Sequence, residues 1–278
     1  MKRKINSALI SVSDKENLET ILKILKKFNI KIISSGGTFN KIRKLGYQCI
    51  EVSEYTNFPE MLNGRIKTIN PKIYAGILSN RKQSHNREMR KYNFQNIDLI
   101  IVNFYPFEKI VKKSKSNEKI LENIDIGGPS MARAAAKNYK NLAVISSKKS
   151  YEILKKELLT NKGCTNLNFR QKMAEETFLN TSFYDASIYK YYSNLSSNRF
   201  PQRILFKGTK YEDLRYGENP HQNSAVYLTD DDKKIEKLSG KKLSYNNYND
   251  LYYALLISKS MPRNKGTVII KHANPCGI

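Results

Sequence analysis

Cysteine is scarce in this chain of 278 residues, and its three thiols, Cys49, Cys164 and Cys276, lie far apart. An odd number of widely separated cysteines lacks the paired spacing of a zinc site or of a disulfide framework. We therefore expect reduced thiols and no metal site. Long apolar runs are also missing, since none approaches the roughly 20 residues that a membrane-spanning helix needs.

The N-terminus lacks the pattern of a secretory signal. Its basic start is followed by only a short apolar stretch, from Ala8 to Val12, with no small-residue cleavage pattern after it. We expect the protein to stay in the cytoplasm and to have no membrane partner.

Acidic residues are few, with 25 Asp and Glu against 49 Lys and Arg and a formal net charge of +24. Such a charge invites a nucleic-acid interpretation, because clustered Lys and Arg release counterions from phosphate backbones. Here the lysines are scattered among many Asn, Ile and Tyr residues, which is typical of compositional drift in an A+T-rich genome. We favour anionic small-molecule substrates and a solvated surface over a nucleic-acid partner.

The length suggests two folding units, at about 150 residues per domain. Over the first hundred residues, short apolar runs alternate with helical periodicity, which indicates an α/β fold whose mostly parallel sheet carries helices on both faces. A capping box at residues 13–16 predicts the start of a helix. Strands are predicted at residues 7–12, 31–34, 48–52, 97–102, 141–145 and 267–271.

A long helix is predicted from Phe169 to about Asn194, and it carries many aromatic residues. We interpret these as a packing face, in the core or at a dimer surface: Phe178, Phe183, Tyr184, Tyr189, Tyr191 and Tyr192. Residues 193–201 lose periodicity and gather Ser, Asn and Pro, as linkers do. The domain boundary is therefore expected near residue 199, giving domains 1–199 and 200–278.

Polar residues lie at or just after the ends of three of the predicted strands. They are Ser11, Ser13 and Lys15, then Ser35, Gly36, Gly37 and Thr38, then Asn103 and Tyr105. In an open doubly wound sheet, ligands bind beyond the carboxyl ends of the strands, where turn amides also point. A single Ser-Gly-Gly-Thr turn is more often an ordinary helix entry, but recurrence at successive strand ends favours a phosphate pocket.

Six motifs occur in order along the whole chain. They are Gly64-Arg65-Ile66-Lys67-Thr68, Asn103-Phe104-Tyr105-Pro106-Phe107, the run from Ile124-Asp125-Ile126-Gly127-Gly128-Pro129 to Ala135-Ala136-Lys137-Asn138, Leu214-Arg215-Tyr216-Gly217-Glu218-Asn219-Pro220-His221-Gln222, Leu243-Ser244-Tyr245-Asn246-Asn247 and Lys271-His272-Ala273-Asn274-Pro275-Cys276-Gly277. The first three resemble the IMP cyclohydrolase domain of the bifunctional purine biosynthesis enzyme, and the others resemble its AICAR formyltransferase domain. On composition alone, the first motif could be a surface turn.

The resemblance implies a methylglyoxal-synthase-like, doubly wound parallel sheet domain, followed by the start of a cytidine-deaminase-like α/β domain. It also implies a homodimer. In the cyclohydrolase step, the carboxamide nitrogen of formyl-AICAR attacks the formyl carbon, and the carbinolamine loses water to give IMP. No cofactor or metal is implied for this step, which requires a proton shuttle and support for an oxyanion.

Carried over by resemblance, Asp125 and Lys137 are the acid/base pair, and Lys67 and Tyr105 stabilise the developing oxygen charge. The amides of Ile126 and Gly127 fit an oxyanion hole. Residues assigned to the ribose phosphate are Ser11, Ser13, Lys15, Ser35, Gly37, Thr38, Arg65 and Thr68, with Asn103 near the base. Helix rise puts Lys137 about 12 Å beyond Pro129, so its pairing with Asp125 rests on the resemblance. Asn70 and Tyr74 depart from the family pattern, which has histidines there.

In the second domain, the resemblance makes Lys271 and His272 the proton relay for transfer of the formyl group of 10-formyltetrahydrofolate, the co-substrate, to AICAR. Arg215 and Tyr216 would bind AICAR, with Asn246 beside it. Because the sequence stops at Ile278, directly after the relay motif, we expect most of the folate site to be missing and no formyl transfer.

A different interpretation is a non-catalytic phosphate-binding regulatory module of the same α/β fold. Such a module needs the serines at the strand ends and the Gly36-Gly37 turn. It does not need Lys67, Tyr105, Asp125 and Lys137 together, so the presence of all four favours the enzyme.

Overall fold

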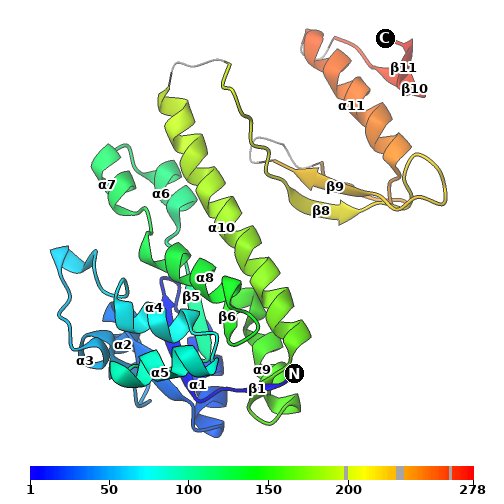
Figure 1. Cartoon of the computed structure of the whole chain (residues 1–278). Coiled ribbons are helices and arrows are strands. Elements are labelled where there is room, and N and C mark those ends of the chain that lie inside the picture. The colour runs from blue at the N-terminus through cyan, green and yellow to red at the C-terminus, as the bar shows by residue number, and fades with distance from the viewer. Residues whose placement is uncertain (197–199, 230–234, 263–264) are drawn as a thin grey trace. The chain divides into compact units, whose positions relative to one another are not determined.

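The computed structural model describes residues 1–196, 200–229, 235–262 and 265–278. The chain divides into two compact units, Met1–Arg199 and Phe200–Ile278 (Figure 1). Across the described ranges, no helix is both long enough and apolar enough to span a bilayer.

A five-stranded parallel sheet forms the centre of the first unit, in the order β4 (Ile50–Glu51), β3 (Lys31–Ser34), β2 (Ser7–Val12), β5 (Leu99–Asn103) and β6 (Ala143–Ile145). The central strand β2 pairs with β3 on one side and with β5 on the other, and Ala8 lies opposite both Ile32 and Leu99. The chain first builds outward from β2 to β4 and then returns to add β5 and β6. The order therefore reverses beside β2, the position at which open α/β sheets bind ligands.

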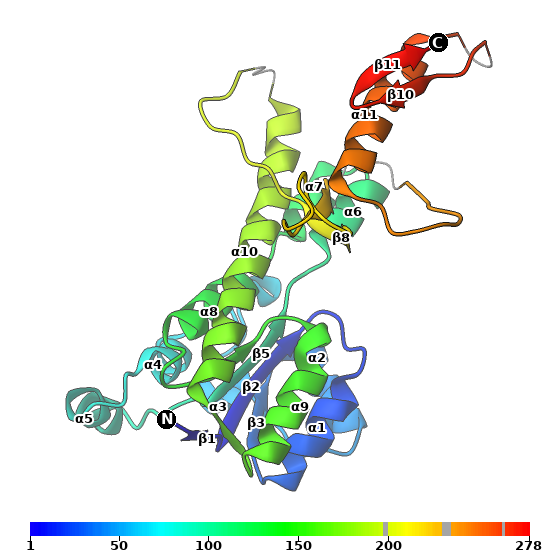
Figure 2. The ribbon, with the colours of Figure 1, turned by 90° about the vertical axis from the view of Figure 1, so that its right-hand side faces the viewer.

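Helices and short turns connect these strands and follow the last of them. They are α1 (Leu18–Lys27), α2 (Gly36–Lys44), α3 (Val52–Thr56), η1 (Leu62–Gly64), α4 (Pro71–Leu78), α5 (Gln83–Lys91), α6 (Phe107–Lys113), α7 (Asn117–Glu122), α8 (Gly127–Lys137), η2 (Lys148–Ser150), α9 (Tyr151–Thr160) and α10 (Leu167–Leu195). A short strand β1 (Arg3–Lys4) pairs antiparallel with β7 (Cys164–Thr165). Figure 2 shows α1 and α9 on one side of the sheet and α4 and α8 on the other.

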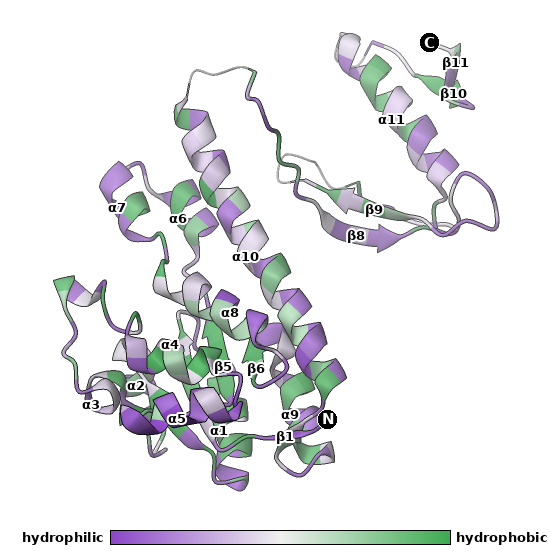
Figure 3. Cartoon of the chain, in the orientation of Figure 1, coloured by the Kyte–Doolittle hydropathy of each residue, from purple (hydrophilic) through white to green (hydrophobic). Residues whose placement is uncertain are grey.

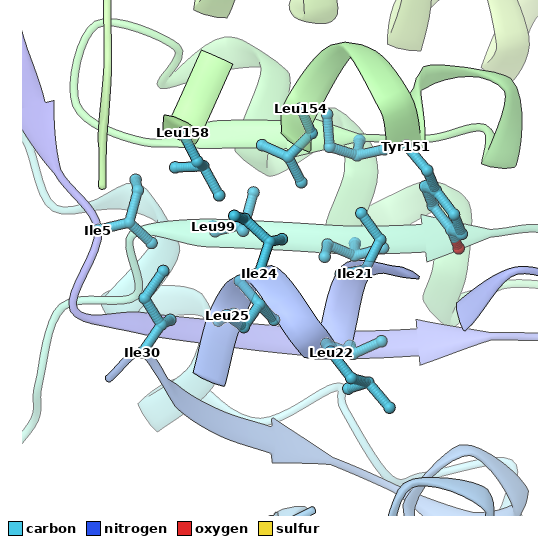
Figure 4. Packing of buried hydrophobic residues seen from close by; sticks show 14 of the residues in the cluster. Ile5, Ile21, Leu22, Ile24, Leu25, Ile30, Leu99, Tyr151, Leu154 and Leu158 are labelled. Atoms are coloured by element: carbon cyan, nitrogen blue, oxygen red, sulfur yellow. The ribbon is translucent and has the colours of Figure 1, made fainter. Parts of the chain in front are cut away.

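Alternation of side chains along each strand divides the core into two apolar layers. Ile10 and Leu99 pack in the layer under α1 and α9, whereas Leu9 and Ile100 pack in the layer under α4 and α8. Figure 4 shows how Leu99 meets the side chains of α1 and α9. Both faces of the sheet are buried, which explains why its strands form continuous apolar runs in the sequence.

The predicted strands at residues 7–12 and 31–34 are confirmed by β2 and β3. The third strand is shorter than predicted, because Val52 already begins α3. The capping box at residues 13–16 is wrong: α1 begins at Leu18, after Asn17 in a left-handed conformation without a side-chain cap. The carboxylates of Asp14 and Glu16 instead contact the ammonium of Lys148.

The long aromatic helix is present as α10. Tyr184 is buried in an apolar cluster with Phe107 and Ile120, so the packing interpretation holds for this residue. Phe178 and Tyr192 are more exposed. The predicted linker begins too early, because α10 continues to Leu195, and residues 197–199 of that linker lie outside the described residues.

The second unit contains a β-ribbon of β8 (Thr209–Asp213) and β9 (Ala225–Leu228), helix α11 (Tyr245–Ser260), and a second ribbon of β10 (Ile269–Lys271) and β11 (Asn274–Gly277). Ser244 and Asn247 form a reciprocal capping box at the start of α11. Among the described residues of this unit, Leu214, Gly217 and Ser244 are the buried ones. Figure 3 shows polar residues along both β8 and α11, in contrast to the apolar strands β5 and β6.

Candidate active site

A cavity of about 890 Å³ lies at the carboxyl edge of the five-stranded sheet. Its walls come from the segments that follow β2, β3 and β5, from the loop around η1, from α7 and the start of α8, and from Tyr192 on α10. The lining includes these predicted site residues: Ser11, Ser13, Lys15, Ser35, Gly37, Thr38, Arg65, Lys67, Thr68, Asn103, Tyr105, Asp125, Ile126 and Gly127.

One end of the cavity combines a glycine turn at a helix N-terminus with nearby lysines. Gly36, with φ of 51°, and Gly37 open helix α2, and both residues line the cavity. A Cβ atom on Gly36 would lie 3.1 Å from the Lys67 Nζ, and one on Gly37 would lie 3.7 Å from the Lys15 Nζ. Two ammonium groups therefore stand next to a glycine turn at a helix N-terminus, the arrangement that binds phosphate groups in many α/β proteins.

Two carboxylates pair with cations of this site. The Lys67 Nζ lies 2.9 Å from the Glu60 Oε1, and Arg65 forms an ion pair with Glu122 of α7. Gly64 has φ of 88°, and a Cβ atom there would lie 2.6 Å from the Glu60 Oε1, so a side chain would disturb the first of these pairs. Ion pairs this exposed are weak, which allows an anionic ligand to compete for the cations.

The other end of the cavity contains Asp125, which is half-buried just before α8. Its Oδ1 accepts a hydrogen bond of 2.8 Å from the amide of Gly128, and the main chain of Tyr105 also donates to the carboxylate. A Cβ atom on Gly128 would lie only 2.5 Å from the Asp125 Oδ2, so glycine is needed there. Burial raises the pKa of Asp125 and outweighs the opposing effect of the two amides. A carboxyl group with a raised pKa is suited to proton transfer.

Two of the predicted ligand-binding side chains already have partners within the protein. The Thr38 hydroxyl donates to the Val12 carbonyl and accepts from the Val12 amide, at 2.9 and 3.1 Å. The Asn103 amide bonds the main chain of Asp14 through both its oxygen and its nitrogen. Both residues line the cavity and also tie its walls together.

Lys137 is the one predicted cyclohydrolase residue that the structure does not bring to the cavity of its own chain. It is exposed at the last position of α8, whereas Asp125 precedes the first turn. The 11 residues of this helix span roughly 15 Å.

The two residues that depart from the family pattern have structural partners. The Asn70 side chain caps α4 by accepting from the Lys72 amide at 2.8 Å. The Tyr74 hydroxyl lies 2.6 Å from the Ser130 Oγ in α8, and burial raises the pKa of Tyr74.

In the second unit, main-chain hydrogen bonds bring the Arg215-Tyr216 segment to the start of α11. The Tyr216 carbonyl accepts from the Tyr245 amide, next to Asn246, and the Arg215 guanidinium lies over the Tyr216 ring at 4.8 Å. Lys271 and His272 lie at the turn between β10 and β11, and the next residue, Ala273, donates its amide to Asp250 of α11. These residues lie on the surface of the described part of the unit.

Sequence reasoning missed the acidic partners of the site, Glu60 and Glu122, and the role of Tyr192 in its wall. Glu60 is four residues before the Gly64 motif and Glu122 is three residues before Asp125, so proximity to the motifs was the available signal. Nothing in the local pattern predicts which cation each carboxylate meets.

The sheet order, the glycine turn and the basic loop at the carboxyl edge define a methylglyoxal-synthase-type domain, and residues 17–130 match the profile of the MGS-like domain. The profile of the AICARFT/IMPCHase bienzyme matches residues 135–278. The chain therefore belongs to the AICARFT/IMPCHase bienzyme family, as the sequence motifs predicted.

Named relatives agree with this family. The chain is 41% identical over 283 residues to the bifunctional purine biosynthesis protein PurH of Bradyrhizobium diazoefficiens, covering 99% of this chain and 53% of the relative. It is 43% identical to the protein of that name from Rippkaea orientalis, covering 98% of this chain and 55% of the relative. The chain thus spans about half the length of the curated relatives it matches. A solved structure titled "Crystal structure of ForH" is 28% identical, with a TM-score of 0.61, and covers 69% of this chain and 99% of its own.

Replacing Asp125 by Asn should stabilise the protein at neutral pH. The folded-state pKa of Asp125 lies above the ordinary value of 3.8, so ionising this carboxyl group destabilises the folded state as pH rises. We expect Asp125→Asn to unfold about 2 °C or more above wild type at pH 7 and to lose this advantage as pH falls toward 3.8. Thermal unfolding across that pH range measures it.

Asp185→Asn is the matched control, because Asp185 is exposed on α10. It should unfold close to the wild-type temperature at pH 7, because a substitution at an exposed position changes stability little. An Asp125→Asn protein less stable than wild type at pH 7 would contradict the burial argument.

Proposed function

We propose that the first unit closes formyl-AICAR to IMP with loss of water, as an IMP cyclohydrolase. The observation that carries this proposal is a single cavity in which an anion-binding end, formed by α2 and Lys15, lies next to Lys67 and the half-buried carboxyl group of Asp125. A ribose phosphate at one end and a reacting base at the other require this combination.

In the proposed mechanism, the amides at the start of α2 and the ammonium of Lys15 hold the substrate phosphate. The carboxamide nitrogen then attacks the formyl carbon, and negative charge develops on the formyl oxygen. Lys67 and Tyr105 stabilise that oxygen, with the amides of Ile126 and Gly127 as further donors. Asp125 transfers the protons that accompany ring closure and loss of water from the carbinolamine.

The alternative, a non-catalytic phosphate-binding regulatory module of the same fold, uses only the anion-binding end. It leaves unexplained a carboxyl group whose pKa is raised by burial and whose oxygens are held by the amides of Gly128 and Tyr105. Keeping such a group in the cavity opposes stability, which favours a catalytic role.

Lys137 can join Asp125 only from a second copy of the chain, because α8 separates the two residues within one chain. We therefore propose a homodimer in which the Lys137 side chain of each subunit enters the cavity of the other. The acid/base pair of the reaction would then form across the subunit interface.

For the second unit we propose a part of an AICAR formyltransferase, with 10-formyltetrahydrofolate as the co-substrate of the whole enzyme. Support comes from the bonded arrangement of Arg215, Tyr216 and Asn246 at the start of α11. Lys271 and His272 would serve as the proton relay. We further propose that the cyclohydrolase needs no cofactor and that the protein works in the cytoplasm.

The first test of the proposal is loss of activity in variants of the cavity. Lys67→Ala and Asp125→Asn should each lower kcat for IMP formation from formyl-AICAR by about 100-fold or more, because each removes a charge-stabilising or proton-transferring group. Absorbance of IMP reports the rate. Lys72→Ala, which removes a lysine on α4 outside the cavity lining, should retain the wild-type rate.

If both cavity variants keep near-normal rates, the assigned roles are wrong. If the wild-type 278-residue chain shows no rate above buffer, the proposed activity itself is wrong.

The second test is complementation between two inactive variants. In a mixed dimer of Asp125→Asn with Lys137→Ala, one of the two shared sites contains both native residues. Random mixing makes about half of the dimers mixed, so about a quarter of the wild-type activity should return. Assays of each variant alone and of the mixture after subunit exchange measure this, and a mixture as inactive as its components would contradict a site shared between subunits.

A further inference from the structure

Tyr184 lies in the middle of α10, with 7% of its surface exposed. Its ring packs against Phe104, with centroids 5.3 Å apart, and against Phe107, with centroids 6.3 Å apart. These residues belong to an apolar cluster that also contains Ile120 of α7. The ring thus fills the space between α10, α6 and α7.

The hydroxyl of Tyr184 is directed at the segment that precedes α8. It accepts a hydrogen bond of 2.7 Å from the amide of Asp125 and donates one of 3.4 Å to the carbonyl of Asn123. Burial raises the pKa of Tyr184 to about 12, so the hydroxyl stays protonated at neutral pH. One side chain therefore holds two main-chain groups of residues 123–125.

The same tyrosine also contacts the other segment that holds the Asp125 carboxylate. That carboxylate accepts from the amides of Gly128 and Tyr105, and Tyr105 directly follows Phe104, on which the Tyr184 ring packs. Tyr184 thus binds residues 123–125 through its hydroxyl and contacts Phe104 through its ring. Both segments meet at Asp125.

We infer that Tyr184 is a positioning residue that holds the Asp125 carboxyl group at the reacting end of the cavity. The inference rests on the proposed cyclohydrolase function and on the role of Asp125 in it. Without the hydroxyl, the Asp125 amide loses its acceptor and the segment before α8 is free to shift. A displacement of about 1 Å at a reacting group can lower a rate by about 100-fold.

The anion-binding end of the cavity depends on other elements. Lys15 follows β2, and the glycine turn opens α2, so neither is held by Tyr184. Loss of the Tyr184 hydroxyl should therefore affect the chemical step and leave substrate binding unchanged.

The test compares Tyr184→Phe with Tyr191→Phe in the full chain. Tyr191 lies on the same helix, its ring contacts Phe107 at 5.9 Å, and its hydroxyl bonds the Asn117 side chain rather than the segment at Asp125. Each variant keeps its ring and loses one hydroxyl. We expect Tyr184→Phe to lower kcat by about 10-fold or more with KM within about 2-fold of wild type, and Tyr191→Phe to change neither.

Thermal unfolding of both variants, measured in parallel, establishes that both are folded. Equal kcat values for Tyr184→Phe and Tyr191→Phe overturn the inference, as does a raised KM at unchanged kcat in Tyr184→Phe.

Asp125→Asn, assayed beside them, separates this inference from the proposed function. An inactive Asp125→Asn protein with a normal Tyr184→Phe protein overturns the positioning role alone. A fully active Asp125→Asn protein removes the catalytic role of Asp125 and the positioning inference together.

Discussion

Parallel pairing of β2 with both β3 and β5 is the constraint on which the site depends. It brings Val12, Ser34 and Asn103, the last residues of these three strands, to one edge of the sheet. The polar segments that follow must then converge, although they are separated by up to about ninety residues in the chain. Hydrogen bonds from Thr38 to Val12 and from Asn103 to Asp14 fix the strand ends to the segments beyond them.

The charged groups in the two parts of the cavity have opposite surroundings. Beside its anion-binding end, Lys67 and Arg65 are paired with Glu60 and Glu122 at the surface, so the cations are oriented but still accessible to a competing anion. At its reacting end, Asp125 is held by uncharged amide donors, and burial dominates its pKa. A protein that needed only to bind phosphate would gain nothing from the second arrangement, and for this reason we connect the site with proton transfer.

Much of the fold could be predicted from the sequence, because strands buried on both faces leave apolar runs that local pattern reveals. The sequence predicts the strands at residues 7–12 and 31–34 correctly. It also correctly predicts that polar residues come directly after these strands. The capping box at residues 13–16 was wrong because the carboxylate of Glu16, its second member, meets Lys148, 132 residues further along the chain. Tertiary contacts of this kind override a local signal. For the same reason, the local sequence pattern could not predict the carboxylate partners of Lys67 and Arg65. It also could not predict the hydrogen bond from the Asp125 amide to the Tyr184 hydroxyl. The acid/base role of Lys137 came from family resemblance alone, and the structure places Lys137 at the opposite end of α8 from Asp125, outside the cavity lining.

A crystal structure of the 278-residue chain with bound IMP would decide whether this cavity is the cyclohydrolase site. We expect the phosphate group within hydrogen-bond distance of the Gly36 and Gly37 amides and the Lys15 Nζ, with the purine base beside Asp125. A nucleotide bound elsewhere, or an empty cavity at saturating IMP, would contradict it.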